Sequence, residues 1–221
     1  GPVMPESVLP VLQTLCDALV AGAVENVEAS GKQITCRAGC GACCRQLVPI
    51  TPMEARTLAE LVDQSPEPRR TQLLERFREV IRRLEESGYL ETLRESQPTT
   101  REDKEALGLA YFGLGIPCPF LENESCSIHP DRPLICREHL VTSPPVHCED
   151  PGGKLVEGIA LKVRLSSLLS RFAEPNGPPG ATWIPLPLAL EWAGTHPSGH
   201  EPRPGPEWVN RLFRILSGAG G

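Results

Sequence analysis

The sequence has no excess of basic residues, no long uninterrupted apolar segment and almost no alternation of apolar and polar residues. Its 221 residues include 22 lysines and arginines against 28 aspartates and glutamates, which gives a net charge of −6 at pH 7. Nucleic acid is therefore not an expected partner. Without a membrane-length apolar run or a basic-then-apolar N-terminus, we expect a cytoplasmic protein with no membrane span and no secretory signal. The lack of alternation predicts little β-structure.

Against these absences the chain has nine cysteines. In a reducing compartment an odd number of cysteines is more typical of metal ligands or free thiols than of a disulfide framework. Cys43 and Cys44 are adjacent, and a disulfide between neighbours would strain the backbone. A secreted, disulfide-rich protein stays open as the second interpretation.

The first cysteine block falls within nine positions and is spaced mainly by glycine and alanine. It contains Cys36, Cys40, Cys43 and Cys44. A segment with so little apolar bulk cannot be ordered by burial, because ordering each residue costs conformational entropy. Binding of a structural metal releases on the order of 10 kcal/mol and can offset that cost. The block therefore predicts a metal site.

The second cysteine block is rich in proline, which excludes a regular helix and favours short extended pieces. It contains Cys118, Cys126 and Cys136. Thiolates select zinc, copper(I) or iron–sulfur clusters over hard cations. Seven clustered cysteines are too many for one four-ligand site and one short of two sites. The residues that could complete the set are His129, His139, His147 and Cys148.

Three arginines lie next to these cysteines in the sequence: Arg45, Arg132 and Arg137. Four thiolates around a divalent metal, or around an oxidised four-iron cluster, leave a net charge near −2 that a partly buried site must offset. We predict that these arginines bind the cofactor through this charge or through hydrogen bonds to sulfur. The alternative is that each one faces solvent.

Helical periodicity predicts most of the remaining structure. Helices are expected over 5–28, after Thr51 as a capping-box N-cap with Glu54, over 68–87, near Thr100 and over 154–172. Cys16 lies on the apolar stripe of the first helix and is interpreted as a core residue. We therefore expect a mainly α fold, a compact helical domain in which two irregular cysteine-rich loops meet around a metal, with little β-structure.

The C-terminal part differs in composition from the rest. We predict a helical cysteine-cluster domain over 1–173, with its core motif at 36–140, and a Pro/Gly-rich strap and C-terminal helix over 174–221 packed on it. Within this part, Leu186–Trp192 is expected to form a short helix. The tail helix is expected to begin at Pro206 and to place Val209, Leu212, Phe213 and Leu216 on one apolar, inward face. Three tryptophans in this part, Trp183, Trp192 and Trp208, could anchor the core or present a contact surface to a partner.

The spacing Cys36-x3-Cys40-x2-Cys43 also matches the three-cysteine loop of radical SAM enzymes. Those enzymes place the loop after the first strand of a βα barrel, whereas here a helix precedes it and the chain is short for a full barrel. Radical SAM chemistry is kept only as an alternative.

Together the two blocks resemble the YkgJ-type cysteine-cluster family, a zinc- or iron-chelating domain. The motifs that carry the resemblance are Cys36-x3-Cys40-Gly-x-Cys43-Cys44-Arg45, Thr51-Pro52-x-Glu54-Ala55, Cys118-Pro-Phe-Leu121, Cys126-Ser-Ile-His129 and Arg132-Pro133-x-x-Cys136-Arg137. His129 departs from the family, which more often has tyrosine there. The resemblance implies metal binding through Cys36, Cys40, Cys43, Cys44, Cys118, Cys126 and Cys136.

A similar cysteine motif occurs in flagellin lysine-N-methylase, which is associated with an iron–sulfur cluster and S-adenosylmethionine. That similarity implies a conceivable methyl transfer to a protein lysine, although the sequence shows no Gly-rich loop after a strand. We expect a protein that coordinates an iron–sulfur cluster, or zinc, with a redox or SAM-linked role on a protein substrate or small molecule. The alternative is a zinc-stapled interaction module without catalysis. Whether the chain is an enzyme stays open; if it is, the candidates for proton transfer are His129, Glu138, His139 and His147.

Overall fold

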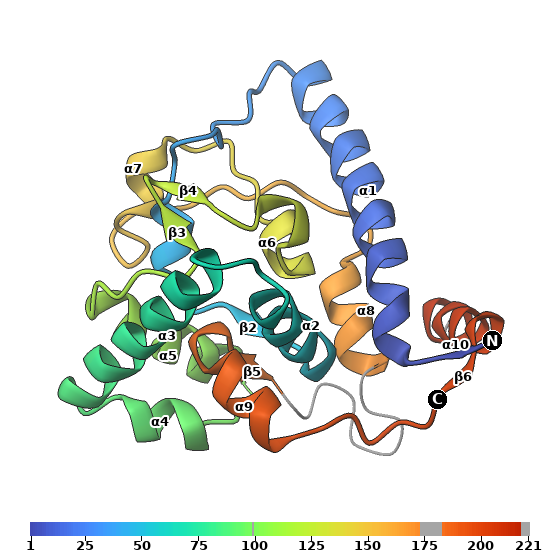
Figure 1. The fold of residues 1–221 in the computed structure, drawn as a ribbon. Coiled ribbons are helices and arrows are strands. Elements are labelled where there is room, and N and C mark those ends of the chain that lie inside the picture. The colour runs from blue at the N-terminus through green and yellow to red at the C-terminus, as the bar shows by residue number, and fades with distance from the viewer. Residues whose placement is uncertain (99, 173–182, 218–221) are drawn as a thin grey trace.

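The computed structural model describes residues 1–98, 100–172 and 183–217, and Figure 1 shows that helices dominate the chain, which confirms the mainly α prediction. The α-helices are α1 (Leu9–Ala29), α2 (Pro52–Asp63), α3 (Arg69–Glu86), α4 (Leu90–Glu95), α5 (Arg101–Gly113), α6 (Leu134–Glu138), α7 (Pro145–Cys148), α8 (Leu165–Phe172), α9 (Ala189–Thr195) and α10 (Gly205–Leu216). Four short 3₁₀ helices accompany them: η1 (Pro5–Val8), η2 (Ala42–Arg45), η3 (His129–Asp131) and η4 (Leu186–Leu188).

The strands of the described residues are short and form three antiparallel pairs. They are β1 (Pro2–Val3) with β6 (Arg203–Pro204), β2 (Pro49–Ile50) with β5 (Ile184–Pro185), and β3 (Leu121–Glu122) with β4 (Ser125–Cys126). Each pair joins segments that are otherwise loops. The β3–β4 pair is a tight hairpin whose two turn residues, Asn123 and Glu124, have φ values of 48° and 56°. This hairpin carries Cys126, so the turn fixes a cysteine of the second block.

One apolar core lies between α2, α3, α4 and the η4–α9 segment. Its buried side chains include Leu58, Leu73, Leu84 and Leu186, and Phe77 meets Phe120 edge to face with 5.3 Å between ring centroids. Cys118 and Cys126 pack against this core from the second cysteine block. The helical bundle therefore supports one side of the cysteine region.

A second apolar core lies between α1, α6, α8 and α10. Leu12, Leu134 and Leu169 are completely buried there, and Trp208 is 2% exposed. Cys16 is buried in the same core, as the helical stripe predicted. Trp208 is thus a core anchor, which is the first of the two roles considered for the tryptophans.

The capping box predicted at the start of α2 is confirmed. The Glu54 amide donates to Thr51 Oγ1 at 3.3 Å, and the Thr51 amide donates to Glu54 Oε2 at 2.9 Å. The other carboxylate oxygen, Glu54 Oε1, accepts the Leu134 amide at the start of α6 at 2.9 Å. Burial raises the pKa of Glu54, and these backbone bonds oppose the rise. One buried carboxylate therefore begins α2 and fixes α6 against it.

The helix predicted over 154–172 is wrong in its first half, because α8 begins only at Leu165. Residues 157–159 instead pair with 140–142: the Thr142 amide donates to the Glu157 carbonyl and the Ile159 amide to the Leu140 carbonyl, both at 2.9 Å. The apolar residues in this stretch are therefore extended. They run beside the segment that links α6 to α7.

The other helix predictions are confirmed with small shifts. Helices occupy 9–29, 69–86 and 101–113, and Gly88 follows α3 with a φ of +70°. In the C-terminal part, η4 and α9 cover the predicted Leu186–Trp192 helix and the tail helix begins at Gly205. Phe213, expected to face inward, is 61% exposed. The strap prediction for 174–182 lies outside the described residues.

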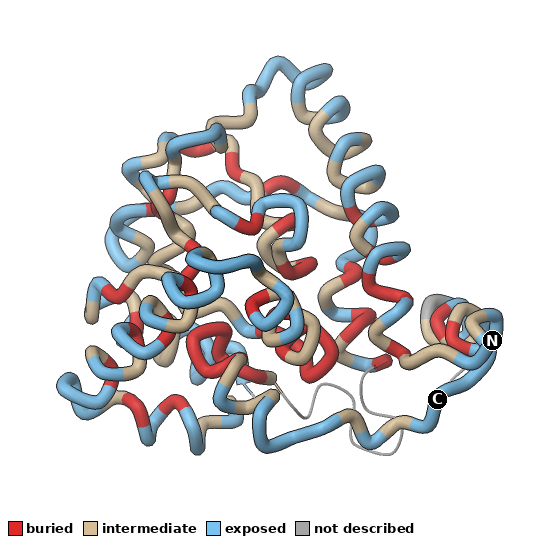
Figure 2. The backbone as a smooth tube through the Cα atoms, viewed as in Figure 1, coloured by how far each residue is buried: buried red, intermediate tan, exposed pale blue. Residues whose placement is uncertain are grey.

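One segment corrects the expectation about apolar length. Residues Pro5–Ala29 form a continuous helical stretch with a mean hydropathy of 1.6 in its most apolar window, which is long and apolar enough to cross a membrane by length and composition alone. Core helices of soluble proteins and signal sequences share these properties. Figure 2 shows that only the half of α1 near η1 is buried, and its buried residues are Leu9, Leu12 and Cys16.

Candidate metal centre

The first cysteine block forms an irregular loop that ends in η2. Gly39 has a φ of +81°, and the Cys40 amide donates to the Arg37 carbonyl at 3.1 Å. Among the residues described, only Gly41 and Ala42 of this loop are buried. The low burial agrees with the expectation that something other than apolar packing orders this loop.

The loop lies directly on the β3–β4 turn. A Cβ atom at Gly41 would stand 2.5 Å from Glu124 Oε2, 2.7 Å from Leu121 Cδ1 and 3.2 Å from Glu124 Cα, so a side chain here would displace the ends of both side chains and crowd the turn backbone. Arg45 forks onto both carboxylate oxygens of Glu124 at 2.6 and 2.9 Å. The two cysteine blocks are therefore clamped together by a bidentate ion pair.

Backbone contacts bring the second block to the first. The Cys118 amide donates to the Cys44 carbonyl at 2.7 Å, and the Leu121 amide donates to the Cys118 carbonyl at 2.9 Å. Cys126 pairs with Leu121 across the β3–β4 hairpin. Cys44, Cys118 and Cys126 are consequently neighbours although they lie far apart in the sequence.

Cys136 joins this side from α6. Its thiol is buried, and burial together with the charges of Cys118, Glu54 and Cys43 raises its pKa well above the usual value. The Glu54 carboxylate that accepts the Leu134 amide holds the start of α6 in place. The same capping box that begins α2 therefore positions Cys136.

The other side of the site contains Cys148, which sequence reasoning could not assign. Cys148, at the end of α7, is 5% exposed and forms a small apolar cluster with Ala42 and Val141, against which Cys36 and Cys40 pack. The Val141 amide lies 3.4 Å from Cys36 Sγ, and Thr35 Oγ1 donates to the Ser143 carbonyl at 2.6 Å. These bonds hold the α6–α7 link beside the first loop.

Cys43 lies between the two sides. Its pKa is lowered to about 7, mainly because its thiolate accepts a hydrogen bond from the Cys44 thiol, and the Cys44 pKa is raised by the same bond. The charge of Cys43 acts on the thiols of both sides. Burial raises the pKa of Cys118 to about 12 and raises those of Cys36, Cys126 and Cys148. The thiols whose pKa is raised are therefore protonated near neutral pH, whereas Cys43 ionises in that range.

The three predicted arginines have different surroundings. Arg45 pairs with Glu124, and Arg137 Nη1 donates to both carboxylate oxygens of Asp17 in α1 at 2.8 and 2.9 Å. Arg132 has a buried Nε that lacks a hydrogen-bond partner in the described part of the chain, and its charge lowers the pKa of Cys36, Cys43 and Cys126. Arg132 is thus the arginine whose field reaches thiols on both sides.

The candidate histidines have different surroundings. His147 Nδ1 lies 2.8 Å from the Leu155 carbonyl. His139 is half-buried, and burial and Arg164 lower its pKa. The pKa of His129 is lowered by burial, Arg132 and Arg137. Glu138 accepts from the Ser166 amide and hydroxyl, which fixes the start of α8 rather than a proton-transfer site.

All nine cysteines are free thiols, and the disulfide alternative therefore receives no support. Among the residues described, no three cysteine, histidine, aspartate or glutamate side chains converge closely enough to hold an ion as they stand. The thiols are neighbours whose side chains must still turn toward a common centre. The donor set fits a soft metal, because sulfur is the common donor of every segment that meets here.

Two comparisons with known proteins found no similarity: no curated protein and no solved structure matches the chain. The comparison with protein families did find one. Residues 35–150 match the family model CxxCxxCC, described as a zinc- or iron-chelating domain, and the matched region spans both cysteine blocks and Cys148. It covers more than half of the chain. The chain therefore belongs to the CxxCxxCC family and is a metal-binding protein of the zinc- or iron-chelating type.

Proposed function

We propose that the chain binds its metal through eight cysteine thiols, in two groups of four that meet at the Cys43–Cys44 peptide bond. The first group is Cys36, Cys40, Cys43 and Cys148, and the second is Cys44, Cys118, Cys126 and Cys136. The observation that carries this proposal is the packing of Cys148 with Cys36 and Cys40. It adds the eighth donor that seven clustered cysteines lack. Four thiolates are the set that holds one tetrahedral zinc or one iron–sulfur cluster.

The protonation of the thiols fits this use. Thiols bind metal as thiolates, so loading displaces protons, and the raised pKa values mean that the empty cluster keeps most of them. Cys43, with its pKa near 7, offers the first thiolate at the meeting point of the two groups. Arg132 favours ionisation on both sides.

We propose an iron–sulfur cluster as the resident cofactor, with a redox role. When bound, such a cluster accepts and releases single electrons at a potential set by charge, burial and hydrogen bonds to sulfur. The buried Nε of Arg132, which has no hydrogen-bond partner among the described residues, is a donor of the kind that tunes sulfur ligands. Because each group offers four thiolates, each iron of a four-iron cluster would have a protein ligand. That favours electron transfer or sensing over a SAM-linked role, in which an iron keeps an open position for substrate.

Zinc is the second candidate, and the weak packing of the first loop favours it. Residues 36–45 have little buried side-chain surface, so two closed four-thiolate sites would fasten this loop to the β3–β4 hairpin, α6 and α7. In that case the metal is structural and the activity lies on another surface.

Metal and acid-labile sulfide analysis, with an absorption spectrum, on protein purified without oxygen tests the proposal. Iron and sulfide in comparable amounts, with visible absorption, support the cluster. A colourless protein with about two zinc ions per chain supports the second candidate, in which zinc has a structural role. Protein that carries neither metal after anaerobic purification and reconstitution contradicts both.

A further inference from the structure

A second site lies at the other end of the molecule from α7, where α10 packs beside β6 (Figure 1). A pocket of about 140 Å³ is lined by Arg203, Glu207, Trp208, Asn210, Arg211 and Arg214. Three guanidinium groups thus share one pocket with one carboxylate, in a chain whose net charge is −6. The pocket is therefore locally basic, although the chain as a whole is acidic.

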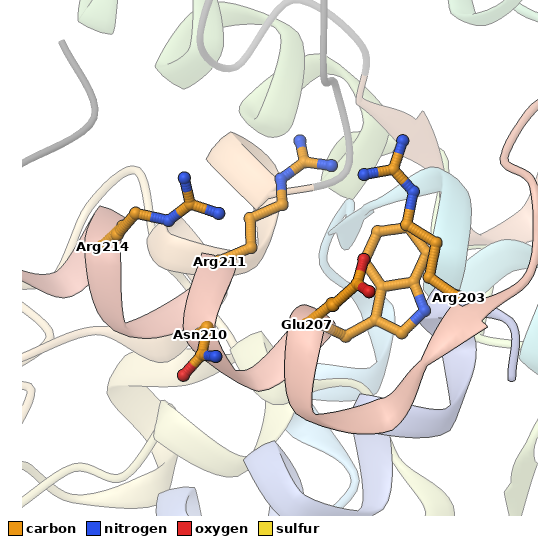
Figure 3. A pocket seen from close by; sticks show the side chains of 6 residues that line it. Arg203, Glu207, Asn210, Arg211 and Arg214 are labelled. Carbon is orange, nitrogen blue, oxygen red and sulfur yellow. The ribbon is translucent and has the colours of Figure 1, made fainter. Parts of the chain in front are cut away.

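The pairing of β6 with β1 and the helical spacing of α10 bring the three arginines to the same pocket. Arg203 lies in β6 opposite Val3 of β1, and the indole Nε1 of Trp208 donates to the Val3 carbonyl at 2.8 Å. Arg211 and Arg214 follow Glu207 at helical spacing on α10, so all three lie on one face of this helix. Figure 3 shows the guanidinium groups of Arg211 and Arg214 projecting from one side of α10 and that of Arg203 reaching the same side from β6, whereas Asn210 points away from them.

Aromatic rings hold two of the arginines in position. The Arg203 guanidinium lies 5.6 Å from the centroid of the Trp208 ring, and that of Arg211 lies 5.0 Å from the centroid of Phe172. Trp208 and Phe172 meet edge to face at 6.0 Å between centroids, and both are buried. The guanidinium groups of Arg203 and Arg211 are therefore preorganised on buried aromatic rings, which reduces the conformational entropy that they would lose on binding a ligand.

These charges lack compensation within the part of the chain that is described. No carboxylate there lies within ion-pair distance of Arg203, Arg211 or Arg214, although Glu207 lines the same pocket. Arg211 is half-buried, and burial together with the charges of Arg203 and Arg214 lowers its pKa. Like charges gathered around a half-buried arginine favour a bound anion.

We propose that this pocket binds a dianionic phosphate group. Guanidinium forks match the oxygens of phosphate in geometry and in charge, and three of them can approach one group from different sides. The pocket is independent of the thiol cluster, because its residues come from β6 and α10 rather than from the segments that carry the cysteines.

Isothermal titration of the metal-loaded protein with inorganic phosphate, in low-chloride buffer, tests the proposal. Arg211→Gln should weaken phosphate binding by about tenfold or more, the loss expected for a charge-assisted contact. Arg171→Gln is the matched control, since Arg171 is an exposed arginine of the adjacent α8 that does not line the pocket. Unfolding midpoints without phosphate show whether each variant stays folded.

A second titration, with adenosine 5′-monophosphate, distinguishes the source of the phosphate. Tighter binding of the monoester assigns the pocket to an organic phosphate, and equal affinity assigns it to free phosphate. No heat with either ligand overturns the proposal, as does equal binding by the wild type and Arg211→Gln. Glu174 lies outside the described residues, and it follows α8 by two positions in the sequence. A Glu174→Gln variant is therefore also titrated, to test whether this carboxylate neutralises the three arginines. If phosphate binds only after that change, the arginines are satisfied within the chain and the proposal is wrong.

Discussion

At the scale of single residues, Cys148 and Arg132 decide how the thiol cluster is interpreted. Cys148 packs beside Cys36 and Cys40 and makes the donor count eight. Arg132 has a buried nitrogen without a partner in the described structure and lowers the pKa of thiols in both groups. In the proposed site, Cys148 supplies the eighth donor and Arg132 favours ionisation of the thiols.

We predict that Cys148→Ala removes about half of the bound metal, because the first group then has three thiolates. Metal and sulfide content per chain measure this directly. Cys16→Ala is the matched control, since Cys16 is also a buried cysteine but lies in the second apolar core. A Cys148→Ala protein with full metal content would remove Cys148 from the site.

Arg132→Gln is expected to make metal loading more sensitive to acid. Thiolates compete with protons for their metal, and Arg132 lowers the pKa of Cys36, Cys43 and Cys126. Without this charge the thiols hold protons to higher pH, so the midpoint of acid-induced metal release should move upward. Absorbance or metal release followed against pH measures the midpoint, with exposed Arg78→Gln of α3 as the control. An unchanged midpoint would show that Arg132 does not act on the bound site.

At the scale of elements, α2 and α6 are joined by one carboxylate. Glu54 accepts from the Thr51 amide, from the Thr51 hydroxyl and from the Leu134 amide. Cys136 lies on α6, two residues after Leu134. The helix start that the sequence predicts at Thr51 is thus also a support for the thiol cluster.

Thr51→Ala should lower the free energy of unfolding by about 1 kcal/mol, the usual cost of losing an N-cap oxygen. Thr51→Ser keeps that oxygen and should stay close to the wild type. Urea unfolding of both variants in the metal-loaded state measures the difference. Equal stability of Thr51→Ala and Thr51→Ser would contradict the role given to the hydroxyl.

The elements that the sequence predicts correctly are those with local signals. Thr51 and Glu54 are three residues apart, and Gly88 ends α3 with the positive φ that favours glycine. The helix expected over 154–164 fails because residues 157–159 pair with 140–142, a contact that periodicity cannot reveal. Phe213 fits the apolar spacing of α10 but is exposed, because Trp208 and Leu212 take the buried face.

At the scale of the whole molecule, two helical cores flank a cysteine region that has little apolar packing of its own. Cys118 and Cys126 pack on the first core, while α6 packs in the second. The sequence predicts that the two cysteine blocks meet, and the bond from the Cys118 amide to the Cys44 carbonyl brings them together. Cys148 was not assignable, because only the folded link between α6 and α7 brings it to the first loop.

Removing the metal should loosen this region while the cores persist. Amide hydrogen exchange of residues 36–45, 121–126 and 145–148 is expected to speed up by more than about tenfold after chelation, since metal binding is coupled to the order of these segments. The amides of α3 should change little, because its buried residues lie in the first apolar core. Mass-resolved exchange of the loaded and chelated protein measures both. Equal exchange in the cysteine loops would mean that the metal does not order them.

The most direct test of the central claim is X-ray absorption at the K edge of the metal that the anaerobically purified protein carries. If eight thiolates hold the cofactor in two groups of four, the nearest shell contains only sulfur, at about 2.3 Å. At an iron edge, an additional iron–iron distance would identify an iron–sulfur cluster. At a zinc edge, a sulfur shell without a metal–metal distance would identify the structural zinc sites of the second candidate. A nearest shell with nitrogen or oxygen ligands would contradict the eight-thiolate site.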